Sequence, residues 1–81
     1  MMNMERATNC GVEVVAHIAV LREYKDGTTL ELNRTQQGSN PEKWDLRRWH
    51  KDEAGRKTPG RGILLNDREL DELKAVLNEY C

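Results

Sequence analysis

Residues 12–27 read VEVVAHIAVLREYKDG, and this stretch decides the fold. Its first ten residues are rich in the β-branched side chains that strands favour, and Asp26-Gly27 is a common hairpin turn. We therefore expect a strand, a turn and a second strand. Strict alternation would place Val12, Val14, Ile18 and Val20 on one face and Val15, His17, Ala19 and Leu21 on the other. Because both faces then carry apolar groups, one can take a helix and the other needs a second partner.

Three further strands are predicted at residues 28–37, 43–51 and 61–65. They are separated by Gly38-Ser39-Asn40-Pro41 and by a polar loop over residues 52–60 that contains two glycines and a proline. In the second strand Leu30 and Leu32 share one face, while the polar residues alternate onto the other. These polar residues are Asn33, Thr35 and Gln37. The second strand should therefore be half-buried.

A helix is predicted from Asp67 to about Tyr80. Asn66 and Glu69 form a variant of the capping box, and Asp67 places negative charge at the positive end of the helix dipole. Its apolar residues repeat at spacings of three and four: Leu70, Leu73, Val76, Leu77 and Tyr80. We expect this apolar stripe to cover one face of the sheet, which gives an α+β fold with four antiparallel strands and one C-terminal amphipathic helix.

One domain is expected from a chain of 81 residues, with a flexible segment at residues 1–11 and the folded domain at 12–81. Hydrophobic residues make up 37% and charged residues 33%, a balance that favours a folded core, which self-association would help to stabilise. The polar start, Met1 to Asn9, does not resemble a signal peptide, and no run is long enough to cross a bilayer. We expect a cytoplasmic protein with no membrane contact, and association with a bacterial nucleoid stays open.

The charge is unevenly distributed although the net charge is only -1. Residues 43–61 contain seven basic and three acidic side chains, whereas the segments before and after carry net charges of -2 and -3. A basic stretch in a nearly neutral protein indicates a local site for an anion. The alternative is a charged surface that is only solvated.

The third strand carries the candidate nucleic-acid site. Alternation places Arg47, Trp49 and Lys51 on one face, with Lys43 at the start of the same face. Single-stranded nucleic acid is held by cations along its phosphates and by aromatic rings on which bases stack. A base could stack on Trp49 while its phosphates pair with Arg47 and Lys51. The alternative is that Trp49 belongs to the core, as we expect for Trp44, which shares its face with Leu46.

Weaker candidates lie nearby. The amides of Asn33 and Gln37 can bind base edges or phosphates, and His50 can stack on a base or pair with a phosphate. His17, on a mostly apolar strand, is more typical of a hydrogen-bonded structural histidine. Cys10 and Cys81 lack the spacing of a zinc site, so we expect free thiols in a reducing compartment.

Catalytic and cofactor motifs are not found in this sequence. Pro59-Gly60-Arg61-Gly62 has neither the dinucleotide fingerprint nor the ending of a P-loop, and it precedes a strand rather than a helix. No nucleophile and base, paired carboxylates or metal-ligand spacing stands out. We expect no enzyme, no cofactor, no metal and no small-molecule substrate.

A family resemblance rests on Trp44-Asp45-Leu46-Arg47-Arg48-Trp49, a polar loop, Pro59-Gly60-Arg61-Gly62-Ile63-Leu64-Leu65-Asn66 and the amphipathic helix. This order resembles the core of the positive-cofactor-four family of transcriptional coactivators. The stretches Val15-Ala16-His17-Ile18-Ala19-Val20-Leu21 and Glu31-Leu32-Asn33 are similar to its compact bacterial YdbC-like branch. Together the resemblance covers about residues 12 to 80.

The resemblance implies a strongly curved four-stranded antiparallel sheet, one helix, and a homodimer with grooves for single-stranded DNA. It also implies that Arg47 meets the DNA, that Trp49 is the family's strand aromatic, and that Arg61 is the cation before the Gly-Ile step. His50 falls where many members have a stacking aromatic. Two departures predict lower affinity: no lysine separates Arg61 from Gly62, and Gln37 stands where the bacterial branch often has tryptophan.

The function expected is largely sequence-independent binding of single-stranded DNA, with RNA left open, in transcription, replication or repair. One alternative is a protein-interaction adaptor that recognises an acidic partner through the same basic sheet. Another is a purely structural dimer, and an enzyme that shares groups across a dimer interface is a remote third.

Overall fold

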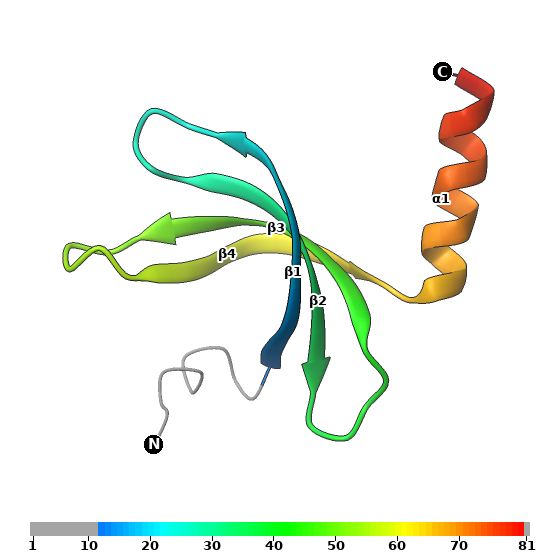
Figure 1. The fold of residues 1–81 in the computed structure, drawn as a ribbon, viewed down its shortest axis with the longest axis horizontal. Helices are drawn as coiled ribbons and strands as arrows, with labels where there is room; N and C mark the ends of the chain where they lie inside the picture. Colours follow the sequence, from blue (N-terminus) through cyan, green and yellow to red (C-terminus); the bar gives the residue numbers. More distant parts are fainter. Residues whose placement is uncertain (1–11, 81) are drawn as a thin grey trace.

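The computed structural model describes residues 12–80, which form one curved antiparallel sheet and one helix (Figure 1). The strands are β1 (Val12–Glu23), β2 (Thr29–Gln37), β3 (Lys43–Lys51) and β4 (Lys57–Leu65), and they lie side by side in sequence order. The helix α1 spans Asp67–Tyr80. The predicted α+β class and element order are therefore confirmed. The expected flexible segment at residues 1–11 and both cysteines lie outside the described residues.

The turn between β1 and β2 is built as the Asp-Gly pair predicts. Gly27 has a φ of +89°, a region that side chains other than glycine rarely adopt. The Tyr24 amide donates to the Thr28 carbonyl at 2.7 Å, and the Asp26 carboxylate accepts from the Thr28 amide at 2.9 Å. This carboxylate hydrogen bond also lowers the pKa of Asp26. The hairpin therefore fixes where β2 starts.

Strict alternation in β1 is wrong, because the strand has three β-bulges. The register with β2 shifts between Val14 and Ala16, between His17 and Ala19, and between Val20 and Arg22. Each bulge inserts one unpaired residue into β1, so residues three apart, and not two apart, point to the same face. This face carries Val14, His17 and Val20, opposite Thr35, Asn33 and Glu31 of β2. His17 thus joins the face of Val14 rather than opposing it.

The fourth strand is longer than predicted. It begins at Lys57 and includes Thr58, Pro59 and Gly60, which the sequence placed in a loop. Pro59 is tolerated because β4 is an edge strand, which has a hydrogen-bonding partner strand on one side only. Gly62 is required by close approach, since a Cβ there would lie 2.0 Å from the Cβ of Arg47. The longer strand brings Lys57 onto the sheet.

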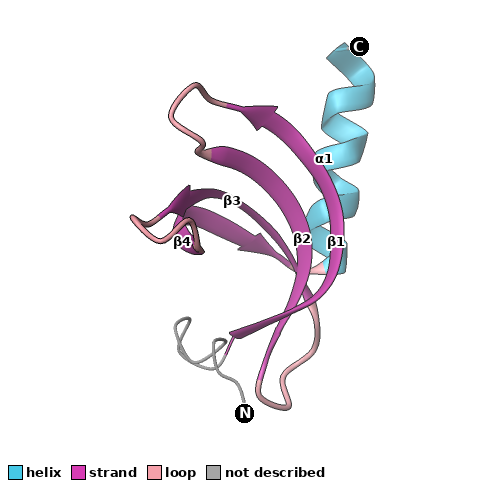
Figure 2. Cartoon of the chain, turned by 60° about the vertical axis from the view of Figure 1, so that its left-hand side comes forward, coloured by secondary structure: helices cyan, strands magenta, loops and turns pink. Residues whose placement is uncertain are grey.

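The two faces of the sheet differ in a way that the sequence did not predict. The strands bend strongly, so one face is concave and the other convex (Figure 2). On the concave face the polar residues of the middle strands are buried: Glu31, Asn33, Thr35 and Asp45 are each at most 3% exposed. On the convex face Leu30, Leu32 and Leu46 are only half-buried. Curvature crowds the concave side chains together and spreads the convex ones apart.

The start of the helix is capped as predicted. The Asn66 amide donates to Glu69 Oε1 at 2.8 Å, and Asn66 Oδ1 accepts from the Glu69 amide at 2.7 Å. Asp67 ties this end to the convex face, because it accepts from Arg34 Nη1 at 2.8 Å and from Trp44 Nε1 at 2.9 Å. These two hydrogen bonds, with that from Arg34 the stronger, lower the pKa of Asp67.

The expected packing of the helix stripe on the sheet is wrong within one chain. The helix leads away from the sheet (Figure 1), and none of its residues is buried. Leu73 is 40% exposed and Leu77 50% exposed. Trp44, predicted to be a core residue, is half-buried beneath the guanidinium of Arg34, 4.5 Å from its ring centroid. Only the first turn of the helix contacts the convex face through side-chain hydrogen bonds, so the stripe stays open.

No apolar side chain is buried among residues 12–80. The radius of gyration is 14.0 Å, whereas a compact chain of this length would have about 11–12 Å. Exposed apolar residues concentrate on β1, on the end of β4 and on the helix stripe. A single chain therefore leaves uncovered the apolar surface that would normally form a core.

Candidate nucleic-acid interface

The concave face is assembled by the register of the strands. Arg47 lies opposite Glu31, and Trp49 lies opposite Thr29 and Pro59. Alternation along β3 therefore places Arg47, Trp49 and Lys51 together on this face, with Lys43 at the other end of the strand. The three residues singled out from the sequence share one face, and that face is not the one nearest the helix.

Arg47 is held tightly against the sheet. Its Nε donates to Asp45 Oδ1 at 2.5 Å, and its Nη1 donates to the Gly60 carbonyl at 3.2 Å. The Arg47 side chain is 21% exposed and that of Asp45 only 2% exposed. The guanidinium is therefore positioned by a buried carboxylate, which neutralises part of its charge.

A second ion pair crosses the same face. Lys57 Nζ and Thr29 Oγ1 both donate to Glu31 Oε2. Burial opposes ionisation of Glu31, but the hydrogen bonds from Lys57 and Thr29 outweigh it, so its pKa is lowered. The Lys57 ammonium also lies 5.8 Å from the ring centroid of Trp49. Trp49 is thus flanked by cations from its own strand and from β4.

His17 and Asn33 form a third polar contact on the concave face. The Nδ1–H of His17 donates to Asn33 Oδ1 at 2.7 Å, and the same nitrogen is 3.8 Å from Glu31 Oε1. His17 is therefore a hydrogen-bonded structural histidine, as its sequence context suggested. Its contact fixes the orientation of the buried Asn33 amide.

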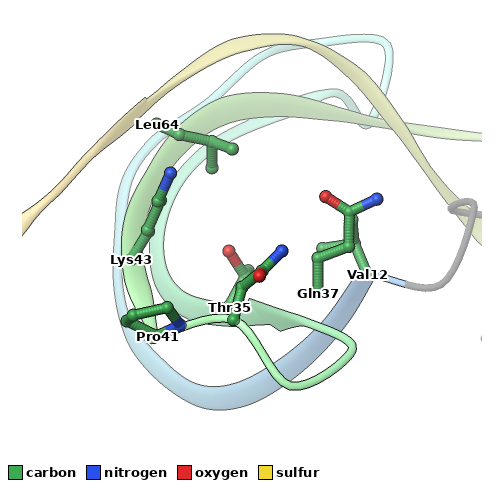
Figure 3. A pocket seen from close by; sticks show the side chains of 7 residues that line it. Val12, Thr35, Gln37, Pro41, Lys43 and Leu64 are labelled. Carbon is green, nitrogen blue, oxygen red and sulfur yellow. The ribbon is translucent and has the colours of Figure 1, made fainter.

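Among the pockets that residues 12–80 form, two open on the concave face. The end pocket, of about 40 Å³, is lined by Val12, Thr35, Gln37, Asn40, Pro41, Lys43 and Leu64. Figure 3 shows the labelled side chains of this group around the hollow of the curved strands. The central pocket, of about 360 Å³, is lined by Val14, His17, Val20, Glu31, Asn33, Trp49 and Lys57. It has room for one planar ring system.

Other predicted site residues are placed as follows. Asn33 is buried in the central pocket, and Gln37 and Lys43 line the end pocket. His50 is on the opposite side of β3 from Trp49, where its Nδ1 is 3.2 Å from Thr28 Oγ1. Arg61 is exposed and lies in the irregular part of the pairing between Arg47 and Trp49. The structure therefore brings six of the eight together and leaves His50 and Arg61 outside the group.

Sequence reasoning missed Glu31, Asp45 and Lys57. Glu31 is two residues from Asn33 on β2, and Asp45 is two residues from Arg47 on β3. Because residues two apart in a strand share a face, the positions of both carboxylates could have been predicted. Lys57 was assigned to a loop and carried no such signal. Within residues 12–80 neither Lys43 nor Lys51 has an ion-pair partner, whereas Arg47 and Lys57 on the same face are paired with carboxylates.

Trp49 also offers an unsatisfied donor. Its indole Nε1 is the one buried side-chain polar atom in the described part of the chain without a hydrogen-bond partner. A buried donor left unpaired costs free energy.

Comparison with protein-family models, curated proteins and solved structures found no match. Residues 12–80 contain no cluster of three or more His, Cys, Asp or Glu side chains suited to a metal ion. No helix in the same range is long and apolar enough to cross a membrane.

Proposed function

We propose that this chain binds single-stranded DNA, with RNA as the alternative ligand, on the concave face of a homodimer. The observation that carries the proposal is the position of Trp49, which lines an open pocket between Arg47, Lys51 and Lys57 instead of lying beneath the helix. Aromatic rings beside cations are what a strand with unpaired bases needs, because bases stack on the rings while the phosphates pair with the cations. A duplex hides its base faces and cannot use Trp49 in this way.

Affinity should be moderate because the face is nearly balanced in charge. Asp45 and Glu31 already compensate Arg47 and Lys57, which leaves Lys43 and Lys51 to attract phosphates. Each phosphate neutralised on a single strand adds about 0.7 to the slope of log affinity against log salt. We expect the slope of log affinity against log salt to correspond to a few phosphates. These phosphate contacts should depend little on base sequence.

The dimer is supported by the apolar surface that one chain leaves open. The helix stripe is exposed, and Ile63 on the convex face is 53% exposed. A second copy could cover both with its own equivalent surface, which would supply a shared core. Because these residues lie away from the concave face, such a dimer leaves both central pockets accessible.

The resemblance to the positive-cofactor-four family supports the same function, and it points to transcription, replication or repair in the cytoplasm. The proposal includes no reaction and no cofactor. The competing adaptor function, binding of an acidic protein segment, would use the same cations but has no unpaired base to stack on Trp49 in the central pocket.

The proposal is tested by fluorescence polarisation with labelled oligonucleotides of equal length: single-stranded DNA, RNA and duplex DNA. Single strands should bind more tightly than the duplex, and binding should weaken as salt increases. An acidic peptide of matched length is the control. Binding of the peptide but of no oligonucleotide would replace the proposal with the adaptor function.

A further inference from the structure

A second group of cations lies on the convex face, beside the turn between β1 and β2. The strand register places Arg22 of β1 and Arg48 of β3 on either side of Leu30 of β2, in one row across the sheet. Both guanidiniums contact the ring of Tyr24. The central carbon of Arg22 is 4.8 Å from the ring centroid, and that of Arg48 is 5.4 Å from it. We call Arg22, Tyr24 and Arg48 the turn cluster.

The two arginines of the turn cluster have no carboxylate to balance them. Within residues 12–80 neither forms an ion pair, and both are exposed. The Tyr24 ring holds them by cation–π contacts, and its hydroxyl accepts a hydrogen bond from Arg48 Nη2 at 3.3 Å. Two guanidiniums side by side, rich in hydrogen-bond donors, suit a phosphate or a carboxylate group.

The acidic side chains near the turn do not cancel this charge. Glu23 is paired with Thr29, which lies on the concave side, so Glu23 points away from Arg22. The Asp26 carboxylate accepts from the Thr28 amide at 2.9 Å inside the turn. In the described part of the chain neither carboxylate lies within ion-pair distance of an arginine of the cluster.

The turn cluster continues the line of cations on the concave face around the end of the sheet. Lys51 ends β3 on the concave side, and its stem lies against the same turn, because a Cβ added to Gly27 would be 3.6 Å from Lys51 Cδ. Figure 1 shows the β1–β2 turn and the end of β3 on the same side of the sheet. A strand that follows β3 as far as Lys51 therefore leaves the concave face beside the turn cluster.

We infer that a bound single strand continues from Lys51 over the β1–β2 turn, and that the turn cluster binds its phosphates on the convex face. This inference rests on the proposed function and extends its binding surface. The Tyr24 ring is already engaged by two guanidiniums, so the cluster recognises phosphates and not bases. Ile63, assigned to the dimer, pairs with Leu46, so the dimer surface and the cluster occupy different rows of the convex face.

The test uses labelled oligo-deoxythymidine of two lengths, about 5 and about 15 nucleotides, which lie in the range that small strand-binding domains cover. The shorter strand fits on the concave face alone, whereas the longer one also reaches the turn cluster. Fluorescence polarisation at several salt concentrations gives the slope of log affinity against log salt for each length. In the double variant Arg22→Gln with Arg48→Gln, the slope for the longer strand should fall by about 0.7 for each of two phosphates, about 1.4 in all.

The shorter strand provides the first control. Its affinity and slope should be the same in the wild-type protein and the double variant, which also shows that the variant is folded. The matched charge control is Arg68→Gln with Lys74→Gln, which removes two cations from the exposed side chains of the helix. It should leave the slope unchanged for both lengths.

The outcomes separate the inference from the function on which it rests. An unchanged slope for the longer strand in the double variant, or an equal fall in the helix control, would overturn the role of the turn cluster and leave strand binding on the concave face intact. An acidic peptide that binds the wild-type protein but not the double variant, with DNA binding unchanged, would assign the cluster to a protein partner instead. Absence of binding to every oligonucleotide would remove both the inference and the proposed function.

Discussion

Lys57 on β4 reaches across Trp49 on β3 and donates a hydrogen bond to Glu31 on β2. The contact ties three strands together on the concave face. It also gives Trp49 two neighbours of opposite charge, a cation over the ring and a buried carboxylate beside it. The proposed strand-binding site depends on this arrangement.

Removing the aromatic ring should weaken strand binding. Trp49→Ala loses the stacking surface, and we expect a cost of about 1–3 kcal/mol in binding free energy. Fluorescence polarisation with a single-stranded oligonucleotide measures this cost. Trp44→Phe is the control, because Trp44 lies on the convex face and should leave the affinity unchanged. An equal loss in both variants would show that the effect is structural.

Releasing Arg47 from its carboxylate should strengthen the electrostatic part of binding. In Asp45→Asn the guanidinium loses its anionic partner and becomes available to one phosphate. The slope of log affinity against log salt should become steeper by about 0.7. Measurement at several salt concentrations gives the slope, and an unchanged slope would mean that Arg47 does not reach the strand.

Charge on the helix stripe should dissociate the proposed dimer. Leu77→Asp places a carboxylate in the apolar stripe, where burial against a second copy would desolvate it. Sedimentation equilibrium should then give a monomer mass. Ala75→Asp adds the same charge on the opposite side of the helix and should remain dimeric. A wild-type protein that is itself monomeric would contradict the dimer directly.

Acid should destabilise the fold in part through Glu31. Its pKa is lower in the folded chain than in the unfolded chain, so its contribution to stability is fully present above the unfolded value of about 4.5 and is lost as the pH falls through the folded value. Chemical unfolding between pH 6 and pH 3 should show a steeper loss for wild type than for Glu31→Gln. Parallel curves would show that other carboxylates dominate.

The sequence predicted the elements that depend on local signals. Asp26-Gly27 marks the first turn, and Asn66 with Glu69 marks the start of the helix, because each encodes a hydrogen bond within a few residues. The two-residue spacing of Arg47 and Trp49 likewise predicted that they share a face. The prediction is correct because the pairing of β3 with β2 has no bulge between these residues.

Other features could not be predicted because they depend on the curvature of the whole sheet. Three bulges in β1 bring His17 to the face of Val14, and no single residue in that strand signals a bulge. Burial of Asn33 follows from the bend of β2 against its neighbours, although its residue type suggests solvent. The stripe around Leu73 was recognised, but periodicity does not say whether the same chain covers it.

The central claim is that the concave face, through Trp49, holds an unpaired strand, and the two indole N–H groups report on it together. In a ¹H–¹⁵N correlation spectrum, addition of single-stranded DNA should shift the Trp49 Nε1–H signal, while the Trp44 Nε1–H signal, bonded to Asp67 on the convex face, should stay in place. A shift of Trp44 alone, or of neither signal at saturating DNA, would contradict the account.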